Sequence, residues 1–91
     1  RRSAEAQGLA NSLHDPRYAR LIELLAEKRR AAGLTQRDVA ARLKLPPSYI
    51  GKIESLQRRL DLIELLDLLD AIGVKPADFF KRALAELHRR A

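Results

Sequence analysis

Hydrophobic positions recur every three or four residues in several short segments separated by glycine and proline, a pattern typical of amphipathic helices. The segments cover residues 16–32, 36–43, 47–55, 61–72 and 76–91. The apolar residues are mostly Leu, Ile and Ala, and strong helix formers outnumber β-branched residues. We therefore expect an all-α fold in which five helices form one compact domain and no strand is required.

Local signals mark where the helices begin and end. Asp15 followed by Pro16 is typical of a helix start, and Thr35 with Asp38 three residues later predicts a capping box. Gly33 suits the left-handed position that follows a helix. Similar signals mark the remaining ends at Pro47, Asp61, Gly73 and Pro76. Within the helix at 47–55, we expect Ile50 and Ile53 to be buried and Ser48, Tyr49 and Lys52 to lie on the outer face.

The helix at residues 61–72 is apolar over most of its circumference. Its acidic residues recur every three positions, which confines the charge to a narrow stripe. They are Asp61, Glu64, Asp67 and Asp70. Two interpretations stay open for the rest of this helix: it forms the centre of the core, or part of it lies in a subunit interface. We favour the core, because a small domain of five helices needs such a centre.

The two ends of the chain differ from its middle. Residues 1–15 have no sustained periodicity and are predicted to be a flexible tail, which leaves residues 16–91 as the folded domain. Arg1 and Arg2 would either lie in solvent or reach a nucleic-acid groove as an arm. The basic end of the last helix is either a solvated final turn, a dimer contact or a lead into a further domain.

The chain carries 18 basic and 12 acidic residues, giving a net charge of +6, which favours a polyanionic partner such as nucleic acid. The charge is uneven: residues 33–60 carry +4, whereas residues 61–80 carry −4. One side of the fold is therefore expected to be basic and the other acidic. No apolar run is long enough for a membrane span, and the absence of cysteine fits a reducing cytoplasm.

An enzymatic role is not indicated. His14 and His88 lie near opposite ends of the sequence, and there is no glycine-rich phosphate loop, nucleophile motif or metal-ligand spacing. We therefore expect neither a metal nor a cofactor.

The stretch GLTQRDVAARLKLPPSYIGKIE, followed by RRLDLIELLDLLDAIGVKPADFF, strongly resembles the lambda-repressor and Cro-like helix-turn-helix family, also called Xre-like. The resemblance covers residues 21–84. It implies that residues 36–43 and 47–55 form the motif and that the second of these helices enters the major groove of double-stranded DNA. It further implies a transcriptional regulator, repressor-like, that acts as a homodimer on a palindromic operator in a prokaryotic or phage setting, at the nucleoid in the cytoplasm.

The resemblance also implies roles for individual residues. The predicted base contacts are Pro47, Ser48, Tyr49 and Lys52. The predicted phosphate contacts are Gln36, Arg37, Lys44, Arg58 and Arg59. Arg29 and Glu54 occupy positions where relatives place an ion pair between helices, and are assigned to structure.

Three residues in the motif depart from the family pattern. Pro46 stands where relatives usually carry a Ser or Thr cap, Pro47 offers no polar side chain, and Gly51 replaces a commonly polar or small residue. Leu56 stands where a glycine often follows the second helix. These departures, together with the apolar helix at residues 61–72, motivate an alternative from another class, a protein-interaction module that has kept the fold without reading DNA. An antitoxin with a toxin partner is a narrower variant of the DNA-binding regulator.

Overall fold

The structure is a computed structural model that describes the backbone of residues 12–90 and the side chains of residues 13–87. Within that range the chain forms a short 3-10 helix and five α-helices, with no strand. The elements are η1 (Ser12–His14), α2 (Pro16–Ala31), α3 (Gln36–Leu43), α4 (Ser48–Glu54), α5 (Leu62–Ile72) and α6 (Pro76–Arg90). The all-α, five-helix expectation is confirmed.

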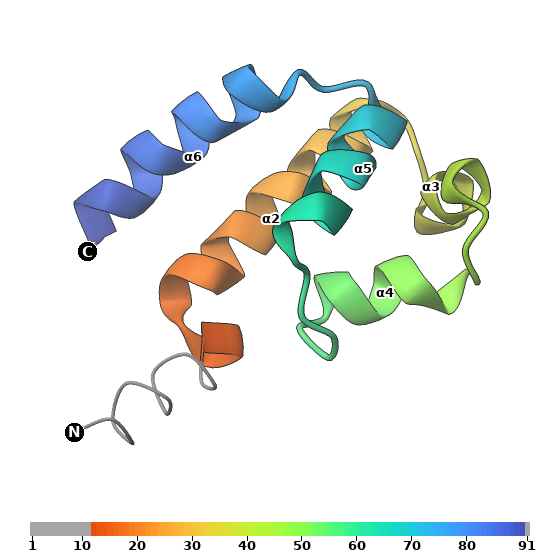
Figure 1. Cartoon of the computed structure of the whole chain (residues 1–91), viewed down its shortest axis with the longest axis horizontal. Helices are drawn as coiled ribbons and strands as arrows, with labels where there is room; N and C mark the ends of the chain where they lie inside the picture. Colours follow the sequence, from red (N-terminus) through yellow and green to blue (C-terminus); the bar gives the residue numbers. More distant parts are fainter. Residues whose placement is uncertain (1–11, 91) are drawn as a thin grey trace.

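Helix α2 runs through the middle of the molecule (Figure 1). It starts where Asp15 accepts a hydrogen bond from the backbone N–H of Arg17 at 2.8 Å, with Pro16 at the first helical position. It ends before Gly33, whose φ of +75° is a left-handed conformation that glycine adopts without steric cost. Its length lets helices α4, α5 and α6 all contact it.

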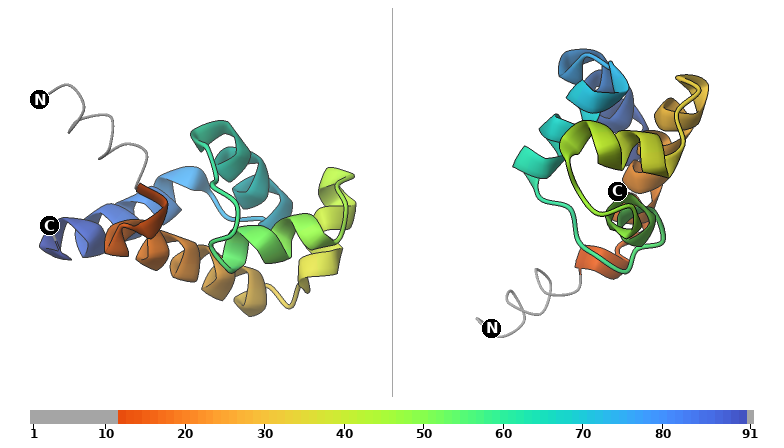
Figure 2. Two further views of the ribbon diagram at one scale, coloured as in Figure 1. Left: turned by 90° about the horizontal axis from the view of Figure 1, so that it is seen from below. Right: turned by 90° about the vertical axis from the view of Figure 1, so that its right-hand side faces the viewer.

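The helix-turn-helix pair lies at one end of the molecule. Helix α3 contacts both α4 and α5, while α6 lies along α2 and away from the pair (Figures 1 and 2). Val39 from α3, Ile53 from α4 and Leu69 from α5 are completely excluded from solvent. Because one fully buried residue comes from each helix, packing fixes the three helices relative to one another.

Helix α5 settles one question left open by its composition. Its buried residues are Leu65, Leu68, Leu69, Ala71 and Ile72, so from Leu65 onward the helix contributes an apolar face to the core. Its first turn differs, since Leu62 is 60% exposed and Ile63 is 64% exposed. The preference for a core helix is therefore right for all but this turn.

Four of the expected helix ends differ by one residue from the observed ones, including the start of α5, where Asp61 is the N-cap and Leu62 the first helical residue. Ala32 is the C-cap of α2 rather than its last residue, and α4 is shorter than residues 47–55. Pro47 is the N-cap of α4 and forms no side-chain hydrogen bond there, because proline has no side-chain acceptor. The chain leaves α4 through Leu56, which adopts a left-handed φ of 64° at the position where the family often has glycine.

The flexible tail predicted for residues 1–15 falls mainly outside the described residues, as do Arg1 and Arg2. The part that is described forms η1 and the Asp15 cap of α2. Among the described residues, no helix has the length and apolar character needed to cross a membrane.

Candidate nucleic-acid interface

Helix α3 begins with the predicted capping box. The backbone N–H of Asp38 donates to Thr35 Oγ1 at 3.0 Å, and the backbone N–H of Thr35 donates to Asp38 Oδ2 at 2.9 Å. The bond from the Thr35 N–H lowers the pKa of Asp38, because it stabilises the ionised carboxylate. These two bonds fix the start of α3, and its exposed Arg37 lies in the same turn.

The turn between the two motif helices is made by Lys44, which adopts a left-handed conformation at φ 58° and ψ 44°. Its backbone N–H and that of Leu45 donate to the last carbonyls of α3, at Ala41 and Ala40. Lys44 is exposed, so its ammonium group projects from the turn between the helices. The backbone here is strained for a residue with a side chain.

A three-residue network joins the motif to α2. Arg29 Nε and Nη2 donate to the two carboxylate oxygens of Glu54 at 2.7 and 3.0 Å, and Arg29 Nη1 donates to the Leu34 carbonyl at 2.8 Å. The Gln36 side-chain amide donates to Glu54 Oε1 at 2.8 Å. The Arg29 and Glu54 side chains are 11% and 12% exposed. The structure therefore brings the two residues of the assigned ion pair together in a nearly buried site.

The same network changes the interpretation of Gln36 and Gly51. The Gln36 side chain was expected at a phosphate, but it is half-buried and directed to Glu54. A Cβ atom at position 51 would lie 3.1 Å from Gln36 Oε1. Gly51 therefore makes room for Gln36, a reason that the sequence did not indicate.

We expect Gly51→Ala to change stability differently in two backgrounds. Alanine in the middle of a helix is worth about 1 kcal/mol over glycine. In the native chain this gain is offset, because the new methyl group displaces Gln36 from Glu54. In a Gln36→Ala background the gain should appear in full. Urea unfolding of the four proteins measures both differences, and equal stabilisation in the two backgrounds would show that Gln36 and Gly51 are independent.

The outer face of α4 is formed by Ser48 and Lys52, which are four residues apart and both exposed. Pro47 is exposed beside them, at the start of the helix. Ile50 and Ile53 on the opposite face are 2% and 0% exposed. This helix is thus held by two buried isoleucines and presents a hydroxyl and an ammonium group to solvent.

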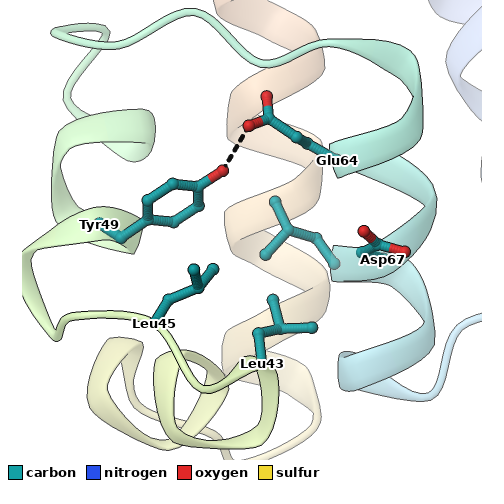
Figure 3. A pocket seen from close by; sticks show the side chains of 6 residues that line it. Leu43, Leu45, Tyr49, Glu64 and Asp67 are labelled. Atoms are coloured by element: carbon teal, nitrogen blue, oxygen red, sulfur yellow. Dashed lines mark hydrogen bonds between the residues drawn. The ribbon is translucent and has the colours of Figure 1, made fainter.

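Tyr49 was expected on the outer face, and this is wrong. Its side chain is half-buried and turns toward α5, where its hydroxyl donates to Glu64 Oε2 at 2.6 Å (Figure 3). The helical pattern misplaced it because position 49 lies at the edge of the buried face, next to Ile50. Arg58 covers the ring, with its Cζ atom 4.4 Å from the ring centroid.

Glu64 joins the two residues. Arg58 Nη2 donates to Glu64 Oε2 at 2.8 Å, and Arg58 Nη1 donates to Glu64 Oε1 at 3.2 Å. The Arg58 hydrogen bond lowers the pKa of Glu64 to about 2, and the same bond raises the pKa of Arg58. Burial and then the hydrogen bond to Glu64 raise the pKa of Tyr49 to about 12. At neutral pH the three groups are therefore a carboxylate, a guanidinium and a protonated phenol.

Beside this group lies a cavity of about 250 Å³ between the motif and α5. It is lined by Leu43, Leu45, Tyr49, Glu64, Asp67 and Leu68 (Figure 3). Within the described part of the chain, no group of three or more acidic or histidine side chains is placed to hold a metal ion.

Two structural contacts near the motif were not foreseen. Arg42 Nη1 donates to the Ala71 carbonyl at 2.7 Å, which ties α3 to the end of α5. The Tyr18 hydroxyl accepts a hydrogen bond from the Leu60 backbone N–H at 2.9 Å, which anchors the segment between α4 and α5. Both join residues far apart in the sequence, so no local pattern signals them. Arg59 is exposed in that segment.

The comparisons with known proteins cover this whole region. Residues 25–79 match a family model described as helix-turn-helix. An XRE-family like protein from Pseudomonas syringae pv. tomato str. DC3000 has a similar structure, with 40% identity and a TM-score of 0.77 over 87% of this chain and 96% of that one. A mutant of the restriction–modification controller protein C.Esp1396I shares the fold, at 22% identity and a TM-score of 0.74, over 85% of this chain and 98% of that one. No curated protein matches the chain.

Proposed function

Because the chain belongs to the XRE-type helix-turn-helix family, we propose that it is a sequence-specific regulator of transcription that binds double-stranded DNA. The observation that carries this proposal is helix α4, whose buried face is fixed by Ile50 and Ile53 while Ser48 and Lys52 face solvent. A helix presented in this way fits the major groove, where base edges are distinguishable.

The side chains have separate roles in this proposal. Ser48 and Lys52 read base edges, and Lys52 suits the O6 and N7 acceptors of guanine. Pro47 contributes apolar contact with a base edge or a thymine methyl group. The phosphates are bound by Arg37, Lys44 and Arg59, which are all exposed. Gln36 contributes through its backbone N–H in the first turn of α3, because its side chain donates to Glu54.

The test is a mobility-shift titration at several salt concentrations, using a duplex selected from a random pool and an unrelated duplex of equal length. Lys52→Ala should weaken binding to the selected duplex by about 5- to 150-fold, the value of one good base contact, and lower the preference for it. Arg37→Ala should weaken both duplexes alike and reduce the log–log salt slope by about 0.9. Lys81→Ala, on the distant helix α6, is the control.

Equal binding of the selected and unrelated duplexes at every salt concentration would contradict sequence-specific regulation. If neither duplex binds, the alternative is a protein-interaction module that has kept the fold. The exposed Leu62 and Ile63 are the observation that favours this alternative.

We also propose that the regulator is a homodimer on a palindromic operator, with the first turn of α5 at the interface. Leu62 and Ile63 are adjacent, and Leu66 lies on the next turn, half-buried. Large apolar side chains this exposed are stabilised when a second copy covers them. Two copies related by a two-fold axis would place their α4 helices on half-sites about 34 Å apart.

We expect Ile63→Lys to convert the dimer to a monomer in sedimentation velocity and to weaken DNA binding at low protein concentration. The lysine places a charge where the partner copy is apolar. The matched variant is Leu84→Lys on α6, where the native leucine is 65% exposed. If Leu84→Lys rather than Ile63→Lys gives the monomer, the interface lies on the last helix instead.

A further inference from the structure

Glu64 is the most heavily bonded carboxylate near the motif. It accepts hydrogen bonds from the Tyr49 hydroxyl and from two nitrogens of Arg58, as described above, and also from the Asp61 backbone N–H at 3.0 Å. Two of these three residues, Tyr49 and Arg58, are among the residues expected to contact DNA. The carboxylate thus occupies two of the donors, the Tyr49 hydroxyl and the Arg58 guanidinium, that are expected to meet an anion from outside.

The Arg58–Glu64 ion pair lies where another anion can replace the carboxylate. The Arg58 side chain is 39% exposed and the Glu64 side chain is 25% exposed, so water reaches the pair. Ion pairs that water reaches contribute little to stability, and they are weakened by salt. A phosphate oxygen offers the guanidinium the same kind of bidentate bonding as a carboxylate, with more negative charge around it.

We propose that in the free protein Glu64 takes the place of a DNA phosphate on Arg58 and Tyr49, so that DNA must displace it and Glu64 lowers the affinity for DNA. This inference rests on the proposed DNA-binding function. Glu64 is then a positioning residue that holds two DNA-contacting side chains against α5 until a phosphate replaces it. When Arg58 moves to a phosphate, the Tyr49 ring loses the guanidinium that covers it. The Tyr49 hydroxyl keeps Glu64 as its acceptor until a phosphate oxygen replaces the carboxylate.

A competing role for Glu64 predicts the opposite effect. If Glu64 holds Arg58 in the position that it needs on DNA, then removing the carboxylate should weaken binding. The specific effect of Glu64 must also be separated from a general effect of net charge, because removing any acidic residue raises the affinity for a polyanion. Asp67 provides the control for charge: it lies one turn further along α5, is exposed, and has no ion-pair partner among the described residues.

The experiment measures affinity and salt slope for Glu64→Gln, Asp67→Asn and Arg58→Ala, and for Glu64→Gln combined with Arg58→Ala, on the selected duplex. Glutamine at position 64 can still accept the capping-box hydrogen bond at the start of α5. If the Glu64→Gln protein does not fold, Glu64→Ala is tested in its place. Circular dichroism confirms that each protein is helical. Glu64→Gln should bind about 5- to 10-fold more tightly than the native chain and steepen the salt slope by up to about 0.9. Asp67→Asn should change affinity less than about 2-fold.

The double variant decides whether Arg58 carries the effect. With Arg58→Ala present, Glu64→Gln should gain no more affinity than Asp67→Asn does. The inference is overturned if Glu64→Gln binds more weakly, if it gains only as much as Asp67→Asn, or if its gain persists without Arg58. If the native chain binds no duplex at all, it is the proposed function that fails.

Discussion

Replacing Glu54 with alanine is expected to destabilise the domain by about 3 kcal/mol, because Arg29 would keep its charge without its partner. Arg29 is 9% exposed and its remaining bond is to the Leu34 carbonyl. Breaking a buried pair typically costs about 3–5 kcal/mol, and the value expected here is at the low end because that bond survives. Urea unfolding followed at the helical signal measures the loss, and the melting temperature should fall by about 10–20 °C.

The matched control is Glu27→Ala, which removes a carboxylate that pairs with Arg20 at 3.2 Å on the surface of α2. Glu27 is 44% exposed in its side chain, so this change should cost less than about 1 kcal/mol. Replacing both buried partners, as Arg29→Met with Glu54→Leu, should recover most of the stability lost by Glu54→Ala. If the double variant is as unstable as Glu54→Ala, the cost does not come from the unpaired charge.

Helix starts and stops are the part of the fold that the sequence predicts well. The Thr35–Asp38 and Asp61–Glu64 capping boxes join residues three apart, so their geometry depends on little beyond the local chain. The left-handed φ of Gly73, +88°, is likewise a local property. These signals, together with the period of the apolar positions, are sufficient to fix the number and order of the helices.

Contacts between helices were much harder to predict. Tyr49 and Glu64 are 15 residues apart, and their hydrogen bond exists because α4 and α5 pack with these two positions facing each other. From the sequence alone, Glu64 is fully explained as the third residue of the capping box that begins at Asp61. No sequence signal indicates that it also binds Arg58. The charge of Arg58 predicts a basic surface but does not indicate the carboxylate that already pairs with it.

Gly51 shows the same limit on a smaller scale. From the sequence, a glycine inside a short helix either allows a close approach to DNA or is merely tolerated. The structure adds a third reason, because a Cβ atom at position 51 would lie 3.1 Å from Gln36 Oε1. This short distance depends on how α3 crosses α4. Residues that act through a crossing of helices need the three-dimensional arrangement before they can be identified.

The second large effect is expected for Ile53→Ala, which should cost about 3 kcal/mol. Ile53 is completely buried, and truncating a buried isoleucine to alanine typically costs about 2–5 kcal/mol through lost burial and the cavity left behind. Helix α4 depends strongly on this residue, because it extends only from Ser48 to Glu54 and has no side-chain hydrogen bond at its N-cap. Short helices are marginal without tertiary packing.

The same change should also weaken DNA binding, since Ile53 holds the helix that presents Ser48 and Lys52. The neighbouring Lys52→Ala is the control: it removes an exposed side chain, so it should leave the unfolding free energy within about 0.5 kcal/mol while reducing DNA affinity. Ile53→Val should cost about 1 kcal/mol and retain most of the binding. Full DNA affinity in Ile53→Ala, measured where the variant is still folded, would mean that α4 is positioned without this contact.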